Sequence, residues 1–177
     1  MKLEEKTAKK NYIYHGKILN LRCDDALLPD GKPCKREIVE HGGGAAVLCV
    51  TEGKVAFVRQ YRYAYGEEVL EIPAGKLEVG EEPMLAAKRE LEEETGLHAE
   101  RLEHLFTLYP SPGYTNEKIY VFEATGAAKG AVHPDDGEFL SVEYYTVEEA
   151  LDMISRGVLR DAKTVSALLF YANKNKQ

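Results

Sequence analysis

The chain has 177 residues, of which 44% are hydrophobic and 30% are charged, and this composition predicts one globular domain with a small appendage. Its formal charge of −7 disfavours wrapping around nucleic acid or docking on an acidic membrane, so neither partner is expected. No apolar run approaches the length of a membrane span and the charged N-terminus has no secretory pattern, so the cytoplasm is the expected compartment.

The first 42 residues are predicted to form a small β appendage. Polar and apolar residues alternate over 11–28, which predicts a strand. The sequence Pro29-Asp30-Gly31-Lys32 is typical of a tight turn, and a second strand over 34–40 is expected to pair back on the first. The remaining residues, 43–177, are predicted to form the main domain.

A run of three glycines, Gly42, Gly43 and Gly44, spans the predicted boundary between the appendage and the main domain. These glycines lack the Lys-Ser/Thr pair of a phosphate-binding loop and precede a strand rather than a helix, so they are interpreted as a flexible entry to that strand. Strands are then expected over 45–50, 54–61 and 69–74.

A helix is predicted over 82–95. Glu82 stands at the N-cap position, Pro83 suits the first turn, and Gly96 suits the position after the last turn. Further elements are expected in chain order: strands over 102–109, 117–124 and 138–145, and helices over 147–155 and 161–173. Many strands with short turns and few helices favour an α+β fold over a doubly wound sheet.

The predicted helix carries a cluster of carboxylates. Glu90, Glu93 and Glu94 share one face at helical spacing, and Arg89 lies one turn before Glu93. The opposite face is expected to pack on a sheet through Leu85, Ala86, Ala87 and Leu91. Clustered carboxylates repel one another unless a cation lies among them, and their oxygens suit Mg²⁺ or Mn²⁺. Taken alone, however, the cluster is also compatible with an ordinary solvated acidic face.

The sequence of the loop before the helix favours a metal site over a solvated acidic face. Residues 75–97 follow the pattern G-x5-E-x7-R-E-U-x-E-E-x-G-U, in which U is aliphatic. The matching positions are Gly75, Glu81, Arg89, Glu90, Leu91, Glu93, Glu94, Gly96 and Leu97. This segment, called the box below, resembles the Nudix box at every position of the pattern.

The resemblance implies a Nudix hydrolase with an α/β/α sandwich and a mixed sheet. Such enzymes use Mg²⁺ or Mn²⁺ to split a nucleoside diphosphate linked to another group. The resemblance also implies metal binding by Glu90, Glu93, Glu94 and the carbonyl of Ala74, while Arg89 orients the carboxylates. Glu81 is expected to support the loop.

Features outside the box resemble the ADP-ribose pyrophosphatases of that family. Pro112 follows the box by 15 residues and lies in a loop that leads to Glu117. The resemblance implies that Glu117 is the catalytic base. Glu93 is the next candidate for that role. Arg62 and Glu71 lie in two further similar segments and are expected to bind substrate. The implied reaction converts ADP-ribose to AMP and ribose 5-phosphate.

The β appendage occupies the place where these enzymes build a homodimer. Arg36 and Glu37 lie in the appendage and are expected to reach a neighbouring subunit's site, with Arg36 binding substrate there. Tyr12 and Tyr14 can stack on a base or simply pack. The histidines show no ligand spacing and are expected to carry no chemistry; they include His41, His98 and His133.

Several alternatives stay open. The substrate can be another nucleoside diphosphate derivative, such as a sugar nucleotide, a dinucleoside polyphosphate or an oxidised nucleotide. Pro112 can serve only to define a turn, Glu117 can be a solvated residue at the start of a strand, and Arg62 can be a surface charge. A non-catalytic sensor of ADP-ribose is a further alternative, although such proteins typically lose box glutamates.

Overall fold

The computed structural model describes residues 2–130 and 139–175. The described chain divides into two compact units. The first comprises the described residues up to Gly43 together with Tyr109–Lys118, and the second comprises Gly44–Leu108 and the described residues from Ile119 onward. Segment 109–118, which the sequence analysis assigned to the main domain, thus belongs to the same unit as the N-terminal strands.

The first unit contains an antiparallel sheet. Its strands are β1 (Lys6–Lys9), β2 (Tyr12–His15), β3 (Leu19–Leu27) and β4 (Pro33–His41). The central strand β3 pairs with each of the other three. The expected hairpin of β3 and β4 is confirmed, with Gly31 at a positive φ of 85° in the connecting turn.

The prediction of one strand over 11–28 was wrong. The chain reverses at Gly16, whose N–H donates to the carbonyl of Leu19 at 3.0 Å, so that β2 folds back onto β3. The only local signal of the turn is the single Gly16, and the prediction did not use it. The short strand β1 was also missed.

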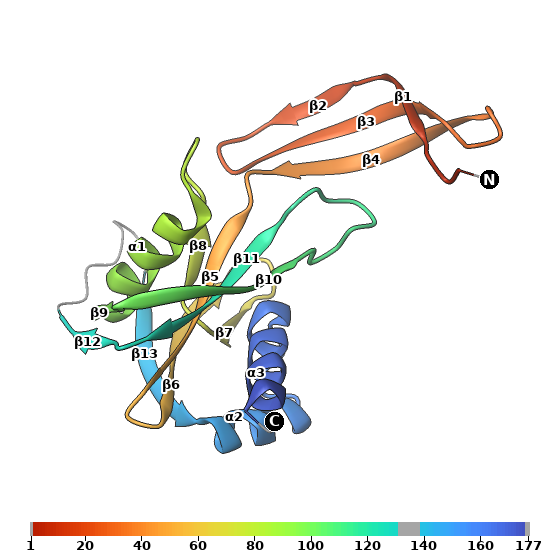
Figure 1. Cartoon of the computed structure of the whole chain (residues 1–177). Coiled ribbons are helices and arrows are strands. Elements are labelled where there is room, and N and C mark those ends of the chain that lie inside the picture. Colours follow the sequence, from red (N-terminus) through yellow and green to blue (C-terminus); the bar gives the residue numbers. More distant parts are fainter. Residues whose placement is uncertain (1, 131–138, 176–177) are drawn as a thin grey trace. The chain divides into compact units, whose positions relative to one another are not determined.

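The second unit is built on a mixed sheet (Figure 1). Its strands are β5 (Gly44–Thr51), β6 (Lys54–Arg62), β7 (Glu67–Glu71), β8 (Ala74–Lys76), β10 (Arg101–Leu108), β11 (Ile119–Thr125) and β13 (Leu140–Thr146). A separate pair is formed by β9 (Leu97–His98) and β12 (Ala128–Lys129). The sheet is mixed because β5 runs parallel to β11 but antiparallel to β6 and β8.

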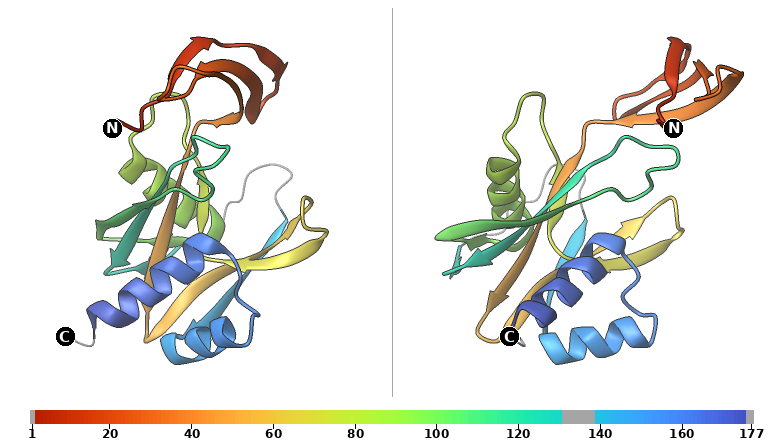
Figure 2. Two further views of the ribbon diagram at one scale, coloured as in Figure 1. Left: turned by 90° about the vertical axis from the view of Figure 1, so that its right-hand side faces the viewer. Right: turned by 45° about the vertical axis from the view of Figure 1, so that its right-hand side comes forward.

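Helices cover both faces of this sheet (Figure 2). They are α1 (Pro83–Thr95), α2 (Val147–Ser155) and α3 (Ala162–Lys174). Successive residues of β5 enter opposite cores: Val47 joins Leu91 of α1, whereas Leu48 joins Ala150 of α2 and Leu168 of α3. The molecule is therefore an α+β protein with the expected α/β/α layering.

Local sequence signals predicted where the helices begin and end to within one residue. Helix α1 begins after Glu82, whose side chain accepts from the N–H of Met84, and ends at Gly96 with φ 67°. The expected packing of Leu85 was wrong, because its side chain is 62% exposed. The described part of the chain contains no helix that is both long enough and apolar enough to span a bilayer.

The predicted strand over 69–74 is in fact two strands, β7 and β8, which pair with different partners. Ile72 and Pro73 lie between them. The N–H of Ile72 donates to Oγ1 of Thr164 rather than to a neighbouring strand, and proline has no N–H to donate. Within the predicted strand 138–145, Phe139 precedes β13; residue 138, like His133, lies outside the described residues.

Candidate active site around the box helix

Two box carboxylates lie against strand β8. A Cβ atom built on Gly75 would stand 2.0 Å from Cδ of Glu90, so only glycine allows this carboxylate to approach the strand. The N–H of Ala74 donates to Oε2 of Glu94 at 2.9 Å. Both glutamates are buried. The strand and the helix therefore bring Glu90, Glu94 and the backbone of Ala74 together.

Arg89 gathers the neighbouring acidic side chains. Its Nη1 donates to Oε1 of Glu90 at 2.8 Å and to Oε2 of Glu93 at 3.0 Å. Its Nε and Nη2 form a bidentate pair with Glu81, each at 3.0 Å, and Nη2 also donates to the carbonyl of Lys76. One guanidinium thus connects the loop before the helix to two carboxylates on it.

The hydrogen bonds of this cluster affect its protonation. Hydrogen bonding to Glu81 is the main cause that raises the pKa of Arg89, and the same bond holds the pKa of Glu81 below its usual range. Glu81 also accepts the N–H of Glu78 at 2.9 Å. Glu81 therefore contacts the loop before the helix, in agreement with the role that the family resemblance implies for it.

The chemistry of the donor set fits a divalent cation of the Mg²⁺ or Mn²⁺ type. Glu90, Glu93, Glu94 and the carbonyl of Ala74 are all hard oxygen donors, and they belong to helix α1 and to strand β8, which packs against it. In their described positions, residues 2–130 and 139–175 contain no group of three or more His, Cys, Asp or Glu side chains already arranged around one metal position. Binding would therefore require small side-chain rotations, beginning with the Glu93 carboxylate that Arg89 now holds.

A second charged cluster lies in the same unit. Arg62 forms a bidentate pair with Glu71, with Nε to Oε1 at 2.6 Å and Nη2 to Oε2 at 2.9 Å. Nζ of Lys163 contacts the same Oε2 and also lies 3.0 Å from Asp161. Burial opposes ionisation of Glu71, but the bond from Arg62 and the charge of Lys163 outweigh it, so the pKa of Glu71 is lowered.

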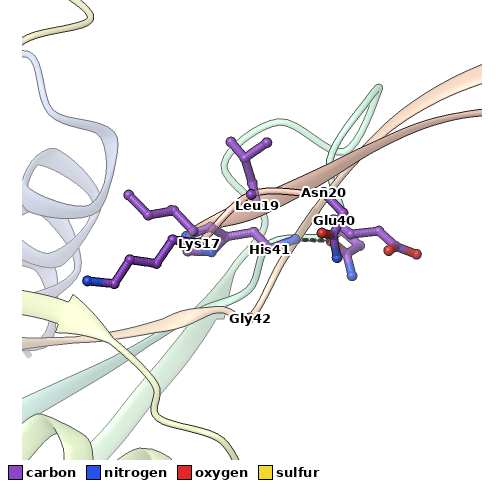
Figure 3. Close-up of a pocket in the computed structure, with 9 residues that line it drawn as sticks. Lys17, Leu19, Asn20, Glu40, His41 and Gly42 are labelled. Atoms are coloured by element: carbon purple, nitrogen blue, oxygen red, sulfur yellow. Dashed lines mark hydrogen bonds between the residues drawn. The ribbon is translucent and has the colours of Figure 1, made fainter. Parts of the chain in front are cut away.

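In the first unit, Glu117 lies beside His41. Oε1 of Glu117 is 3.3 Å from Nδ1 of His41, and the N–H of His41 donates to Oδ1 of Asn116 at 2.8 Å. Hydrogen bonds between Val39 and residues Tyr114 and Asn116 attach this loop to β4. A polar pocket of about 300 Å³ adjoins the same place and includes His41 and Asn116 in its wall (Figure 3).

The other predicted site residues lie elsewhere in the first unit. Arg36, on β4, forms a bidentate pair with Glu5 through Nε at 2.8 Å and Nη2 at 2.6 Å. Pro112 lies in the loop that carries Glu117. The structure therefore groups the predicted residues into three sets: the box cluster, the Arg62–Glu71 pair, and the residues of the first unit.

Sequence reasoning missed Lys163, Asp161 and His41 as members of these clusters. Asp161 could have been found as a helix cap, because its carboxylate accepts the N–H and hydroxyl of Thr164. Lys163 gives no local signal, since its partner Glu71 is 92 residues away in the chain. His41 was expected to carry no chemistry, and the structure places its ring against Glu117.

Comparisons with known proteins show which family the chain belongs to. The NUDIX domain model matches residues 40–168, and the model of the nucleoside diphosphate sugar hydrolase N-terminal domain matches residues 5–39. An ADP-ribose pyrophosphatase of Bacillus subtilis is 45% identical and covers 95% of this chain and 92% of its own. A methanol dehydrogenase activator of Bacillus methanolicus is 44% identical, covering 94% and 92%.

A solved structure described as an ADP compounds hydrolase has the same fold, with a TM-score of 0.87 at 20% identity. The match covers 99% of this chain and 97% of the other. Because the domain model spans most of the chain and the relatives match along nearly its whole length, the protein belongs to the Nudix hydrolase family.

Proposed function

We propose that this protein hydrolyses the pyrophosphate bond of ADP-ribose, giving AMP and ribose 5-phosphate, with Mg²⁺ or Mn²⁺ as cofactor. The observation that carries the proposal is the box cluster, in which Glu90 and Glu94 lie against Gly75 and Ala74. The relative of 45% identity, whose name is ADP-ribose pyrophosphatase, supports this choice of substrate.

The box supplies the site for the cation. Glu90, Glu93, Glu94 and the carbonyl of Ala74 would hold it, while Arg89 sets the directions of the carboxylates. When bound, such a cation supplies positive charge that offsets the charge of a pyrophosphate and acidifies water. The N–H of Ala74 keeps Glu94 oriented beside the strand.

Substrate binding is assigned to Arg62 and Glu71 of the second unit. The same role is assigned to Pro112 and Arg36 of the first unit, with Arg36 acting at a neighbouring subunit's site. A guanidinium can hold phosphate oxygens through two parallel hydrogen bonds, which suits Arg62 for this role. The side chain of Arg62 is 39% exposed while that of Glu71 is 5% exposed, so the arginine is the member of the pair that a ligand can reach.

Proton transfer is assigned to Glu117. Its carboxylate is partly exposed and lies on a loop held to β4, and general base catalysis requires an ionised group that can meet water. Glu93 is the next candidate, because it belongs to the box cluster and is itself partly exposed.

We also propose a cytoplasmic homodimer that forms through the N-terminal sheet. The first unit exposes a group of large apolar side chains on β2 and the turn after it: Tyr12, Ile13, Tyr14 and Ile18. Exposed apolar clusters of this kind favour association. Light scattering after gel filtration would test the dimer, and an Ile13→Asp chain that kept the mass of the unaltered chain would argue against this surface.

Another nucleoside diphosphate derivative is the second candidate substrate. The match of residues 5–39 to the nucleoside diphosphate sugar hydrolase N-terminal domain favours sugar nucleotides among them. The box cluster is assigned to the diphosphate part of the substrate, so it does not select among the groups attached to the diphosphate.

A substrate panel tests the proposal. ADP-ribose, a sugar nucleotide, a dinucleoside polyphosphate and an oxidised nucleotide would each be assayed with Mg²⁺ and compared by kcat/KM. We expect the highest value for ADP-ribose, release of AMP, and loss of turnover with a chelator. Preference for another member of the panel would replace ADP-ribose as the substrate, and turnover that survives the chelator would refute the assigned cation site.

A further inference from the structure

The buried lysine at the start of α3 has no part in the reaction as assigned so far. Lys163 is 8% exposed, and a lysine is rarely buried to this extent unless its charge is paired. Its Nζ lies between Glu71, the last residue of β7, and Asp161, the N-cap residue of α3. This lysine therefore joins the first turn of α3 to the end of β7.

We propose that Lys163 is a positioning residue that acts through Glu71 to hold the Arg62 guanidinium in the orientation that binds substrate. The inference rests on the binding role of Arg62 in the proposed function. Lys163 would not touch the substrate itself.

The geometry of the carboxylate supports this assignment. Glu71 uses both oxygens on Arg62, and Lys163 donates to one of the same two oxygens. With Lys163 in place, the Glu71 carboxylate cannot rotate without breaking an interaction with a buried cation. The bidentate pair engages Nε and Nη2 of Arg62, so it sets the plane of the guanidinium and the direction of Nη1.

The surroundings of Lys163 are themselves tightly held. Asp161 accepts the N–H of Thr164 at 3.0 Å and its hydroxyl at 2.6 Å, while Thr164 accepts the N–H of Ile72 at 2.9 Å. Ile72 follows Glu71 directly. The backbone on both sides of the ion pair is therefore anchored, and the loss of the lysine charge would act mainly on the side chains of Glu71 and Arg62.

The charge of a box glutamate also acts on Arg62. The pKa of Arg62 is raised chiefly by its hydrogen bond to Glu71, and the charge of Glu94 contributes in the same direction. An arginine held rigidly at this position can offer positive charge to a phosphate group beside the box carboxylates. A freely rotating arginine would lose part of that binding energy to side-chain ordering.

The test is a double-mutant cycle on steady-state kinetics with ADP-ribose. Lys163→Met removes the charge and keeps most of the length of the side chain. We expect KM to rise about tenfold with a much smaller change in kcat, because the lost interaction contributes to binding. Lys163→Arg, which restores the charge, should recover most of the loss. In an Arg62→Met background, Lys163→Met should add less than about a twofold effect.

Two further variants separate the effect on Arg62 from the effect of removing a lysine charge elsewhere on α3. Lys174→Met removes a lysine from the other end of α3, where Nζ pairs with Glu123 at 2.9 Å, and it should leave KM unchanged. Glu71→Gln, which weakens the hold on Arg62 directly, should raise KM as Lys163→Met does.

The inference is overturned if Lys163→Met leaves KM unchanged, if its effect is undiminished in the Arg62→Met background, or if Lys174→Met raises KM equally. An unchanged KM in Arg62→Met alone would also overturn it. Absence of ADP-ribose turnover by the unaltered chain would refute the proposed function and this inference together. Turnover without coupling between residues 62 and 163 would refute the inference alone.

Discussion

Replacing Gly75 with alanine is the most direct perturbation of the box cluster. The new Cβ would lie 2.0 Å from both Cδ and Oε1 of Glu90 and 2.3 Å from its Oε2. Ordinary contact at a Cβ begins near 3.4 Å, so the carboxylate would have to move by about 1.4 Å. The carboxylate is held by Arg89, so this movement would also disturb the arginine.

This movement of the Glu90 carboxylate is large enough to affect catalysis. Misplacement of a reacting group by about 1 Å can cost about 10²-fold in rate, so we expect kcat of Gly75→Ala to fall by about that factor. Overpacking at a buried site should also lower the free energy of unfolding by about 1–3 kcal/mol. Steady-state kinetics across a Mg²⁺ titration and thermal unfolding would measure the two effects separately.

Gly157→Ala is the matched control. Gly157 has φ 70° and a Cβ built on it would meet no atom within 4 Å, so the substitution strains the backbone without moving a carboxylate. It should lower stability by about 1–2 kcal/mol and leave kcat unchanged. If Gly75→Ala kept kcat within about twofold of the unaltered chain, the argument that the Glu90 position against β8 is needed for turnover would be wrong.

Three further substitutions test individual carboxylates. Glu94→Gln should abolish turnover but retain the circular dichroism spectrum, because an amide oxygen can still accept the N–H of Ala74 while the charge is lost; residual cation-dependent turnover would contradict this. Glu117→Gln should lower kcat by about 10²–10⁴ with a smaller change in KM, and near-full turnover would move the base assignment to Glu93. Glu71→Gln should lower the free energy of unfolding by about 3 kcal/mol at pH 7, measured by urea unfolding. Because the folded pKa of Glu71 lies below its ordinary value of 4.5, this difference should be complete above pH 4.5 and vanish as the pH falls through the folded pKa; a difference independent of pH would exclude the ion pair as its cause.

Local features of the sequence were sufficient to predict the box helix. The N-cap at Glu82, the proline after it and Gly96 at the end depend only on neighbouring residues, and the structure places them as expected. The contact of Arg89 with Glu93 also follows from helical spacing alone. The spacing of the box likewise indicated the family before any tertiary contact was considered.

Features that depend on chain reversal or distant pairing were not predictable in this way. The turn at Gly16 was missed because a single glycine is its only local signal. The break at Ile72 was missed because the N–H of Ile72 donates to Thr164, which lies far away in the sequence. The neighbours of Glu71 and Glu117, namely Lys163 and His41, come from other elements. The hydrophobic periodicity of the sequence does not predict such contacts, because each depends on how the strands and helices pack.

The arrangement around Arg89 explains how the box can be acidic and still fold. One guanidinium reaches three carboxylates, those of Glu81, Glu90 and Glu93, and leaves a formal excess of two negative charges. Full neutralisation by two further basic residues would stabilise the fold but remove the attraction for a divalent cation. A single arginine instead holds the acidic side chains in place and preserves their net charge. Arg89→Lys would lose the bidentate contact with Glu81 but keep the positive charge. This variant therefore separates the orientation of the carboxylates from the neutralisation of their charge. Replacing Lys88, the neighbour of Arg89, with arginine changes neither and would be uninformative.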